Sequence, residues 1–247
     1  MLRLEALQKS FGGVRALASL SLEVRAGEIL GLIGPNGSGK TTAINSITGL
    51  YRPNGGRVLF DGRDITALPP HRVTRLGISR TFQNLRLFPS RTVEANVRVA
   101  QAPLCHSPAA WLNVFPTRSA RALEEERLRL IGELGLQARR QDLARNLSFG
   151  DQKRLEIARA LAPRPKLLLL DEPAGGMNPA EIEALKGTLL AIRGRGTAIL
   201  LIEHNMNLVM GICDRITVLN FGEVIAEGTP AAVQGDPRVI EAYLGTD

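Results

Sequence analysis

Two kinds of hydrophobic pattern divide the chain. In the first quarter, apolar and polar residues alternate over residues 20–24 and 57–60, and the second segment ends at the turn signal Asp61-Gly62. Alternation of this kind predicts strands that bury one face, and the turn signal favours antiparallel pairing. We therefore expect an antiparallel β region near the N-terminus.

Three other segments are apolar without alternation: residues 28–33, 166–170 and 197–202. Such runs are typical of strands that are buried on both faces, as in a parallel sheet covered by helices. The sequence thus predicts a parallel core sheet and an α/β fold.

Residues 84–160 have a mostly helical pattern, clearest over 118–135 and 151–161. We interpret them as a helical lobe inserted into the core. The prediction is one domain, residues 1–247, with the core and its antiparallel part over about 1–83 and 162–247 and the lobe over about 84–161. Residues 101–120, which include Trp111, give no clear pattern.

Composition sets the class of protein. A chain of 247 residues that is 44% hydrophobic can bury one large core. It contains no apolar stretch long enough to cross a membrane, and Glu5 lies where a secretory signal would become apolar. Cys105 and Cys213 are far apart and lack metal-ligand spacing, which fits a reducing cytoplasm.

The net charge of +7 is compatible with nucleic acid, an anionic membrane or a polyphosphate ligand. The arginines are scattered along the chain, however, so ordinary surface charge explains them best. We expect no nucleic-acid partner.

The strongest chemical motif follows the apolar run that ends at Ile33 and precedes a helical segment at 43–50. Its residues are Gly34, Pro35, Asn36, Gly37, Ser38, Gly39, Lys40, Thr41 and Thr42. Glycines let backbone N–H groups surround a phosphate at a helix N-terminus. Lys40 would neutralise the β- and γ-phosphates, and the Thr41 hydroxyl would ligate Mg²⁺. The motif predicts that the chain binds Mg-ATP.

A second motif is the pair Asp171-Glu172, which ends the apolar run at Leu170. Side chains alternate along a strand, so the two carboxylates should face different surroundings. We expect Asp171 to hold hydrated Mg²⁺ through water, and Glu172 to polarise the attacking water as a general base. An acidic pair that merely caps a strand is the competing interpretation.

Residues 147–152 resemble the signature motif that separates ABC ATPases from other phosphate-loop proteins. They are Leu147, Ser148, Phe149, Gly150, Asp151 and Gln152, and they precede the acidic strand as in that family. The resemblance implies that this helix N-terminus contacts the γ-phosphate of ATP held by a second subunit. Phe149 and Asp151 depart from the commonest motif, and Ser148 is also suited to capping a helix.

Other parts of the ABC pattern follow in order. Phe11, in a segment that ends at Val14, resembles the aromatic residue that stacks on adenine, although a lone Phe is more often part of a core. Gln83 matches the glutamine that reaches Mg²⁺ and the attacking water, and His204 matches the histidine that contacts the γ-phosphate. Residues 176–178 correspond to the D-loop, with Asn178 where the family usually has Asp; Asn178 also suits a helix N-cap.

The resemblance covers nearly the whole chain and implies the ABC ATPase fold: a phosphate-loop NTPase core with a parallel sheet, an antiparallel β subdomain and an inserted helical subdomain. It implies membrane permease subunits, a second ATPase subunit (identical or related), and an external solute-binding protein as an indirect partner. Such a chain would lie in the cytoplasm, on the inner face of the cell membrane.

Residues 76–83, Asn178 and residues 240–245 most resemble ATPases of branched-chain amino acid uptake. Lipopolysaccharide-export ATPases are the second candidate. A soluble ABC ATPase acting on DNA or the ribosome usually has a long coiled coil or two cassettes, which this chain lacks. A regulator that binds ATP without turnover is disfavoured because Glu172 and His204 are both in place.

Overall fold

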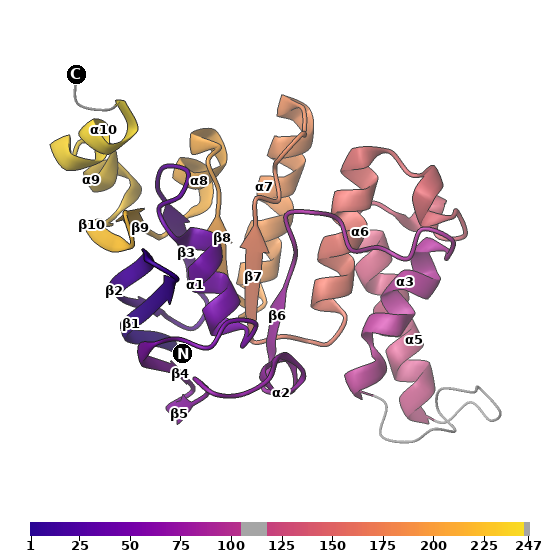
Figure 1. Ribbon diagram of the computed structural model, residues 1–247. Coiled ribbons are helices and arrows are strands. Elements are labelled where there is room, and N and C mark those ends of the chain that lie inside the picture. The colour runs from indigo at the N-terminus through magenta and orange to yellow at the C-terminus, as the bar shows by residue number, and fades with distance from the viewer. Residues whose placement is uncertain (105–117, 245–247) are drawn as a thin grey trace.

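An antiparallel sheet and a larger, mostly parallel sheet occupy the middle of the protein, and a group of helices lies to one side (Figure 1). The computed structural model describes residues 1–104 and 118–244. The antiparallel sheet has the order β2-β1-β4-β5. Its strands are β1 (Leu2–Phe11), β2 (Val14–Val24), β4 (Gly55–Phe60) and β5 (Arg63–Asp64). The antiparallel region predicted from alternation is confirmed.

The turn between β4 and β5 follows from its two residues. Phe60 pairs with Arg63, so Asp61 and Gly62 alone connect the strands. Both have positive φ, 48° and 78°, which matches the right-handed twist of a hairpin and which Asp-Gly adopts readily. The turn signal read from the sequence is confirmed.

The larger sheet has the order β10-β9-β3-β8-β7-β6. Its strands are β3 (Ile29–Ile33), β6 (Ile78–Arg80), β7 (Leu167–Asp171), β8 (Ala198–Ile202), β9 (Arg215–Asn220) and β10 (Glu223–Gly228). All neighbours are parallel except β9 and β10. The three unbroken apolar runs form the fully buried strands β3, β8 and β7. Sequence reasoning missed β6, whose three residues are too few to form a pattern, and β9 and β10.

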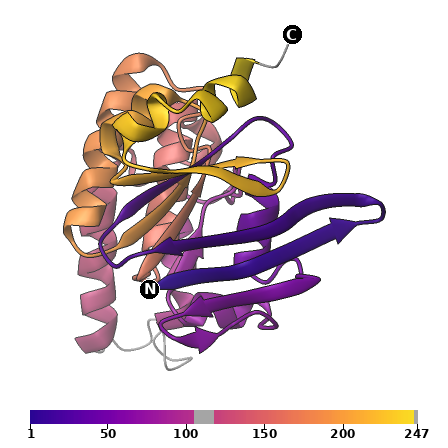
Figure 2. The ribbon, with the colours of Figure 1, turned by 90° about the vertical axis from the view of Figure 1, so that its left-hand side faces the viewer.

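Alternation along the buried strands divides the apolar residues into two cores. Leu168, Leu170 and Leu201 face the helices, whereas Leu167 and Leu200 face α1 (Lys40–Ile47) and the antiparallel sheet. Figure 2 shows the antiparallel strands on one side of the parallel sheet and the helices of the other core on its far side. Each fully buried leucine contributes about 1.5–3 kcal/mol, so the sheet is the rigid base of the protein.

Helices surround this base. They are α2 (Pro70–Arg75), α3 (Val93–Ala100), α5 (Arg118–Glu133), α6 (Phe149–Leu161), α7 (Pro179–Gly194), α8 (Met206–Ile212), α9 (Pro230–Gln234) and α10 (Pro237–Leu244), with short 3-10 helices at Ala102–Leu104, Gln137–Arg139 and Ala144–Asn146. The expected helices at 118–135 and 151–161 are α5 and α6. The helix expected at 43–50 instead starts at Lys40, because Gly39 adopts a left-handed conformation at its N-cap.

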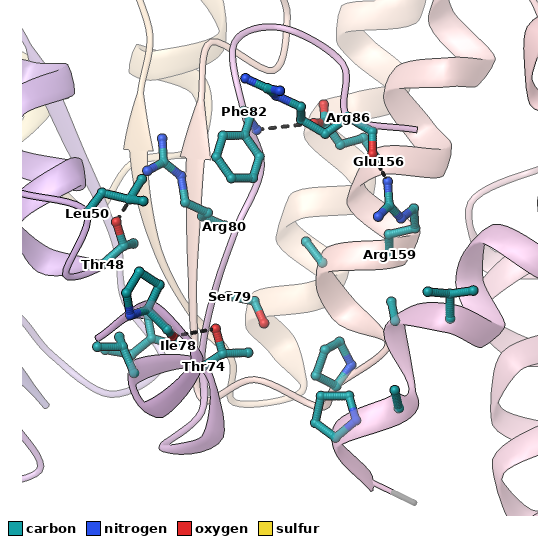
Figure 3. A pocket seen from close by; sticks show the side chains of 18 residues that line it. Thr48, Leu50, Thr74, Ile78, Ser79, Arg80, Phe82, Arg86, Glu156 and Arg159 are labelled. Carbon is teal, nitrogen blue, oxygen red and sulfur yellow. Dashed lines mark hydrogen bonds between the residues drawn. The ribbon is translucent and has the colours of Figure 1, made fainter. Parts of the chain in front are cut away.

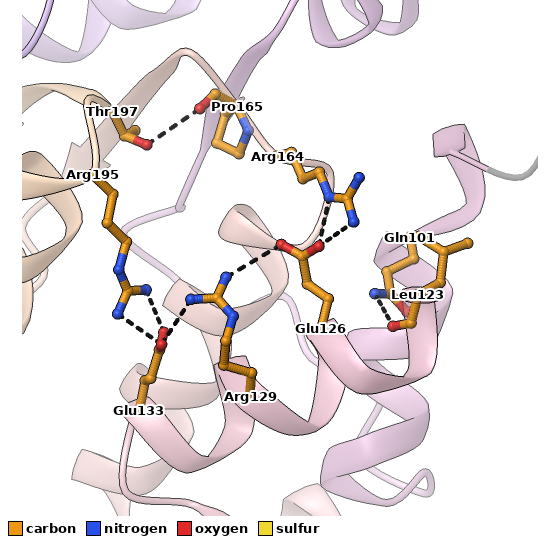
Figure 4. A network of polar contacts seen from close by, with 9 residues as sticks. All are labelled: Gln101, Leu123, Glu126, Arg129, Glu133, Arg164, Pro165, Arg195 and Thr197. Carbon is orange, nitrogen blue, oxygen red and sulfur yellow. Dashed lines mark hydrogen bonds and ion pairs between the residues drawn. The ribbon is translucent and has the colours of Figure 1, made fainter. Parts of the chain in front are cut away.

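Helices α3, α5 and α6 form the group at one side in Figure 1. Ion pairs join α5 to segments that belong to the sheet region (Figure 4). Glu133 accepts hydrogen bonds from Arg129, at 2.8 Å, and from both guanidinium nitrogens of Arg195, which follows α7. Glu126 accepts from Arg164 Nε at 2.6 Å, in the link between α6 and β7.

Two sequence expectations concern single features. Cys213 is a buried thiol, and burial raises its pKa to about 12; Cys105 and Trp111 lie outside the described residues. Within residues 1–104 and 118–244, no helix combines the length and the hydrophobicity that a membrane span needs.

Candidate functional site

The phosphate loop connects the end of β3 to the start of α1, as the strand-loop-helix order predicts. Its first and last glycines are required by their surroundings. A Cβ on Gly34 would lie 1.9 Å from the carbonyl oxygen of Leu219, and one on Gly39 would lie 2.4 Å from that of Ala16. Both have positive φ, which favours glycine. The loop is therefore held tightly against β2 and β9.

Lys40, the first residue of α1, bends back over this loop. Its Nζ donates to the carbonyl oxygens of Gly34, at 2.8 Å, and Pro35, at 2.9 Å. Burial lowers the pKa of Lys40, and the negative charges of Glu172 and Asp171 act in the opposite direction. The ammonium group and both carboxylates thus lie within electrostatic range of one another, at the carboxyl edge of the parallel sheet.

Asp171, the last residue of β7, is buried, with 3% of its surface exposed. Burial raises the pKa of its carboxyl, and Arg80, whose guanidinium lies 3.6 Å away, opposes this shift. The hydroxyl of Thr81 accepts a hydrogen bond from the Asp171 backbone N–H. Arg80 was missed as a partner of Asp171, although it stands only three residues before Gln83 in the sequence.

Glu172 directly follows β7, and the partners of its carboxylate differ from those of Asp171. Its Oε2 accepts a hydrogen bond from Gln83 Nε2 at 3.0 Å, and its Oε1 lies 3.9 Å from His204 Nδ1. The backbone of Glu172 has a φ of 51°, which is unusual for a residue other than glycine. Lys153 Nζ contacts its carbonyl oxygen at 3.4 Å. Three residues predicted from separate parts of the sequence therefore meet at one carboxylate.

The signature segment starts α6. Ser148 is the N-cap, and its hydroxyl accepts a hydrogen bond from the Asp151 backbone N–H at 3.1 Å. The predicted cap is thus confirmed, while the Asp151 carboxylate pairs with Arg154 at 2.8 Å. Across the described residues, no hydrogen bond or ion pair joins the signature to the phosphate loop of the same chain, and α1 and α6 lie on opposite sides of β7 (Figure 1).

The D-loop segment packs against the signature. A Cβ on Gly176 would lie 2.7 Å from the Phe149 ring, so that ring rests on the D-loop backbone. Asn178 caps α7 and forms a complete capping box: its Oδ1 accepts from the Glu181 N–H, and Glu181 accepts from the Asn178 N–H. A Cβ on Gly150 would lie 2.3 Å from Glu181 Oε1, so a larger residue there would displace the Glu181 side chain from this position.

Phe11 lies at the tip of the β1–β2 hairpin, where it pairs with Val14 across Gly12 and Gly13. It is 43% exposed, so the core interpretation does not hold, and Val14 is 70% exposed. The Phe11 ring meets the ring of Tyr51 edge-on, with centroids 5.1 Å apart. Tyr51 follows α1 and was missed, because a lone tyrosine after a helix carries no pattern.

The C-terminal helix α10 also reaches the phosphate loop. Burial raises the pKa of Tyr243, and a hydrogen bond from the backbone of Gly34 acts in the opposite direction. A cavity of about 680 Å³ separates the rest of α10 from the loop, and Asn36, Phe221 and Arg238 are among the residues that line it. The C-terminal helix therefore lies close to the phosphate loop.

The sequence model for ABC transporters matches residues 17–175, which include the phosphate loop, the signature and the acidic pair. The chain belongs to the ABC transporter family. A second model, for branched-chain amino acid ATP-binding cassette transporters, matches residues 223–247. This chain is therefore an ATP-binding subunit whose ATPase chemistry is coupled to transport. Membership of the family implies permease partners and dimerisation.

Curated relatives and solved structures agree with this assignment. The chain is 43% identical to the high-affinity branched-chain amino acid transport ATP-binding protein LivG of Escherichia coli, over 99% of this chain and 98% of the relative. It is 42% identical to BraF of Pseudomonas aeruginosa, with the same coverage, and 36% identical to the lipopolysaccharide export protein LptB of Acidithiobacillus ferridurans, over 99% and 97%.

Among structures, an ATP-binding cassette in its ADP conformation superposes with a TM-score of 0.87 and 34% identity, covering 100% of this chain and 99% of that one. A dimeric cassette bound to ADP and Pi gives 0.78 and 27%, covering 93% and 99%. The predicted fold class is confirmed.

Proposed function

We propose that this chain powers uptake of branched-chain amino acids by binding Mg-ATP, dimerising around it and hydrolysing it. The observation that carries the chemistry is the Glu172 carboxylate, placed between Gln83 and His204 at the carboxyl edge of the sheet. The names of the LivG and BraF relatives support the choice of solute.

Nucleotide binding would use the whole loop from Gly34 to Thr42, with Phe11 and Val14 beside the base. Lys40 now donates to two loop carbonyls and would turn to the phosphates when they enter. The oxygens of Thr41, Asp171 and Gln83 suit Mg²⁺, which prefers hard oxygen ligands, with Asp171 acting through water. Gln83 fits this role because its amide nitrogen is engaged by Glu172, which leaves the amide oxygen available.

In hydrolysis, Glu172 would take a proton from the attacking water, while Gln83 orients the same carboxylate. His204, which lies near the other carboxylate oxygen of Glu172 from the one that Gln83 contacts, would contact the γ-phosphate. The signature, residues 147–152, would complete the site of a second subunit, since within the described part of one chain no hydrogen bond or ion pair joins it to the phosphate loop. That subunit is a copy of this chain or a related ATPase, and the dimeric relative supports the arrangement.

A groove suggests where a permease would bind. It lies between the sheet region and the helical group, with a volume of about 470 Å³, and Leu50, Val73 and Val99 contribute to its apolar wall (Figure 3). Phe82, next to Gln83, also lines it. A permease segment bound in this groove would lie against Phe82, which is the residue next to Gln83 of the proposed site.

The polar groups of the groove fit a permease segment too. Arg159 Nε is buried and has no hydrogen-bond partner among the described residues, and Glu156 accepts a bond from the Phe82 N–H at 3.2 Å. Arg159 also lines the groove and already donates to the Arg86 carbonyl oxygen, so its positive charge, rather than the buried N–H, would attract a permease carboxylate. We propose that residues 84–161 move as one unit with Gln83 as hinge, and transmit the ATP cycle to the permease.

This assembly would hold the chain on the cytoplasmic face of the cell membrane, and a solute-binding protein on the other face would contribute only through the permease. Lipopolysaccharide export is the second candidate, because LptB is also a relative. Deleting the chain in its host decides between them. We expect radiolabelled leucine uptake to be lost while the envelope stays tight; intact uptake with a leaky envelope would favour export.

The site itself is tested by Glu172→Gln. The variant retains every phosphate contact and lacks only the base, so we expect normal ATP affinity, loss of most turnover and accumulation of an ATP-bound dimer. Size-exclusion chromatography with ATP and a steady-state phosphate assay measure the two properties. Near-normal hydrolysis would show that the water is activated elsewhere.

A further inference from the structure

A third acidic residue, outside the predicted site, lies beside it. Glu203 follows β8 directly and is 1% exposed. Its carboxylate accepts three backbone hydrogen bonds: from Ala174 at 2.7 Å, His204 at 3.0 Å and Asn205 at 3.1 Å. No ion pair to Glu203 is present in the described part of the chain. The backbone N–H groups alone hold this buried carboxylate, and they hold it strongly because one partner is charged.

The two oxygens of Glu203 serve two different loops. Oε1 accepts from Ala174, two residues after Glu172, and Oε2 accepts from His204 and its neighbour Asn205. The strands that lead into these loops are adjacent, and Glu172 N–H donates to the Ile202 carbonyl at 2.9 Å. The carboxylate therefore bridges the ends of β7 and β8.

The bridge matters for His204 because little else positions its ring. The ring is 65% exposed, and its one polar approach in the described residues is to Glu172 Oε1 at 3.9 Å. The position of the His204 ring relative to Glu172 therefore depends on the backbone of the loops that follow β7 and β8. The segment bound at Ala174 also continues into the D-loop, which reaches Asn178.

We infer that Glu203 is a positioning residue for ATP hydrolysis: its carboxylate sets the separation of Glu172 and His204 and fixes the start of the D-loop relative to both. This inference rests on the proposed roles of Glu172 and His204. Its carboxylate is engaged by the backbone N–H groups of the two loops, and Glu203 acts through those loops.

The test is Glu203→Gln in the full-length chain. Glutamine has the same shape, but its amide nitrogen cannot accept, so one loop loses its bond whichever way the amide turns. Glu28→Gln is the matched control. Glu28 is also buried, accepts the Arg25 N–H at 2.7 Å and pairs with Arg215, but it stands at the opposite, amino end of β3.

We expect Glu203→Gln to lower kcat at least about tenfold with KM for ATP changed by less than about twofold, because misplaced groups affect the chemical step more than binding. Glu28→Gln should lower the melting temperature without lowering kcat per folded molecule. Equal kcat values for the two variants would overturn the inference.

Two further variants keep the result unambiguous. If Glu203→Gln does not fold, Glu203→Asp replaces it: both oxygens remain, but the shorter side chain cannot span both loops, and an unchanged kcat would refute the bridge. Glu172→Gln is assayed alongside. If Glu172→Gln is inactive and Glu203→Gln is fully active, only the positioning role of Glu203 is refuted. If both variants are fully active, the proposed site itself is refuted.

Discussion

Replacing Phe11 by alanine distinguishes a role in ATP binding from a role in stability. If its ring stacks on adenine, Phe11→Ala removes a contact of about 1–3 kcal/mol, the range for base–aromatic stacking. At about 1.4 kcal/mol per factor of ten, the Kd for ATP should rise about 5- to 150-fold. Tripolyphosphate, which lacks adenine, should bind the variant as it binds the original chain.

The structural cost of the same change is small. Complete burial of a phenylalanine is worth about 1.5–3 kcal/mol, and the ring is 43% exposed, so about 1 kcal/mol of unfolding free energy is at stake. The edge contact with Tyr51 is part of this amount. For a chain of this size the melting temperature should fall by about 2–4 °C.

Phe88→Ala is the control, because Phe88 is 44% exposed and lies in the segment that leads to α3. Both variants should lose similar stability, and only Phe11→Ala should lose ATP affinity. Isothermal titration with ATP and tripolyphosphate, beside calorimetric melting without ligand, measures both. Equal ATP affinity in the two variants would refute stacking at Phe11.

Four shorter predictions follow from the same geometry. Lys40→Ala should weaken ATP binding itself, because the phosphates lose their buried counter-charge; unchanged affinity in a filter assay would count against the loop. Mixing Lys40→Ala with Ser148→Arg subunits should restore some ATP hydrolysis and ATP-induced crosslinking, since one site per mixed dimer keeps both intact halves; activity at the average of the pure variants, without crosslinking, would contradict action in trans. Arg195→Ala should speed hydrogen exchange in α5 and cost at most about 1 kcal/mol, whereas Arg139→Ala, whose ion pair stays within one turn, should not change exchange. Cys213 should resist alkylation at pH 8 until the chain unfolds, because the reactive thiolate forms only near its pKa of about 12.

Local patterns predicted the strands and loops that depend on neighbouring residues. The run before Gly34 had to be a buried strand, and Asn178 followed by Pro179 and Glu181 had to start a helix. The signals were strong because each residue type satisfies a backbone requirement at its own position. Boundaries were less accurate: α1 begins at Lys40, since a glycine can cap a helix without a side chain.

The missed residues share a different property. Tyr51 meets Phe11, Arg80 pairs with Asp171, and Glu203 holds two loops, and each partner is distant in sequence or chosen by the fold. Nothing near Glu203 distinguishes a carboxylate that bridges strands from one that faces solvent. Such contacts become visible only when the sheet order places β7 beside β8.

The left-handed backbone at Glu172 bears on how this chain could change by mutation. A φ of 51° costs a residue with a side chain about 1–3 kcal/mol, and glycine avoids that cost. Glu172→Gly would therefore relieve the backbone while removing the proposed base. A library screened for heat resistance alone would enrich inactive transporters at this position, so the glutamate persists only where growth depends on turnover.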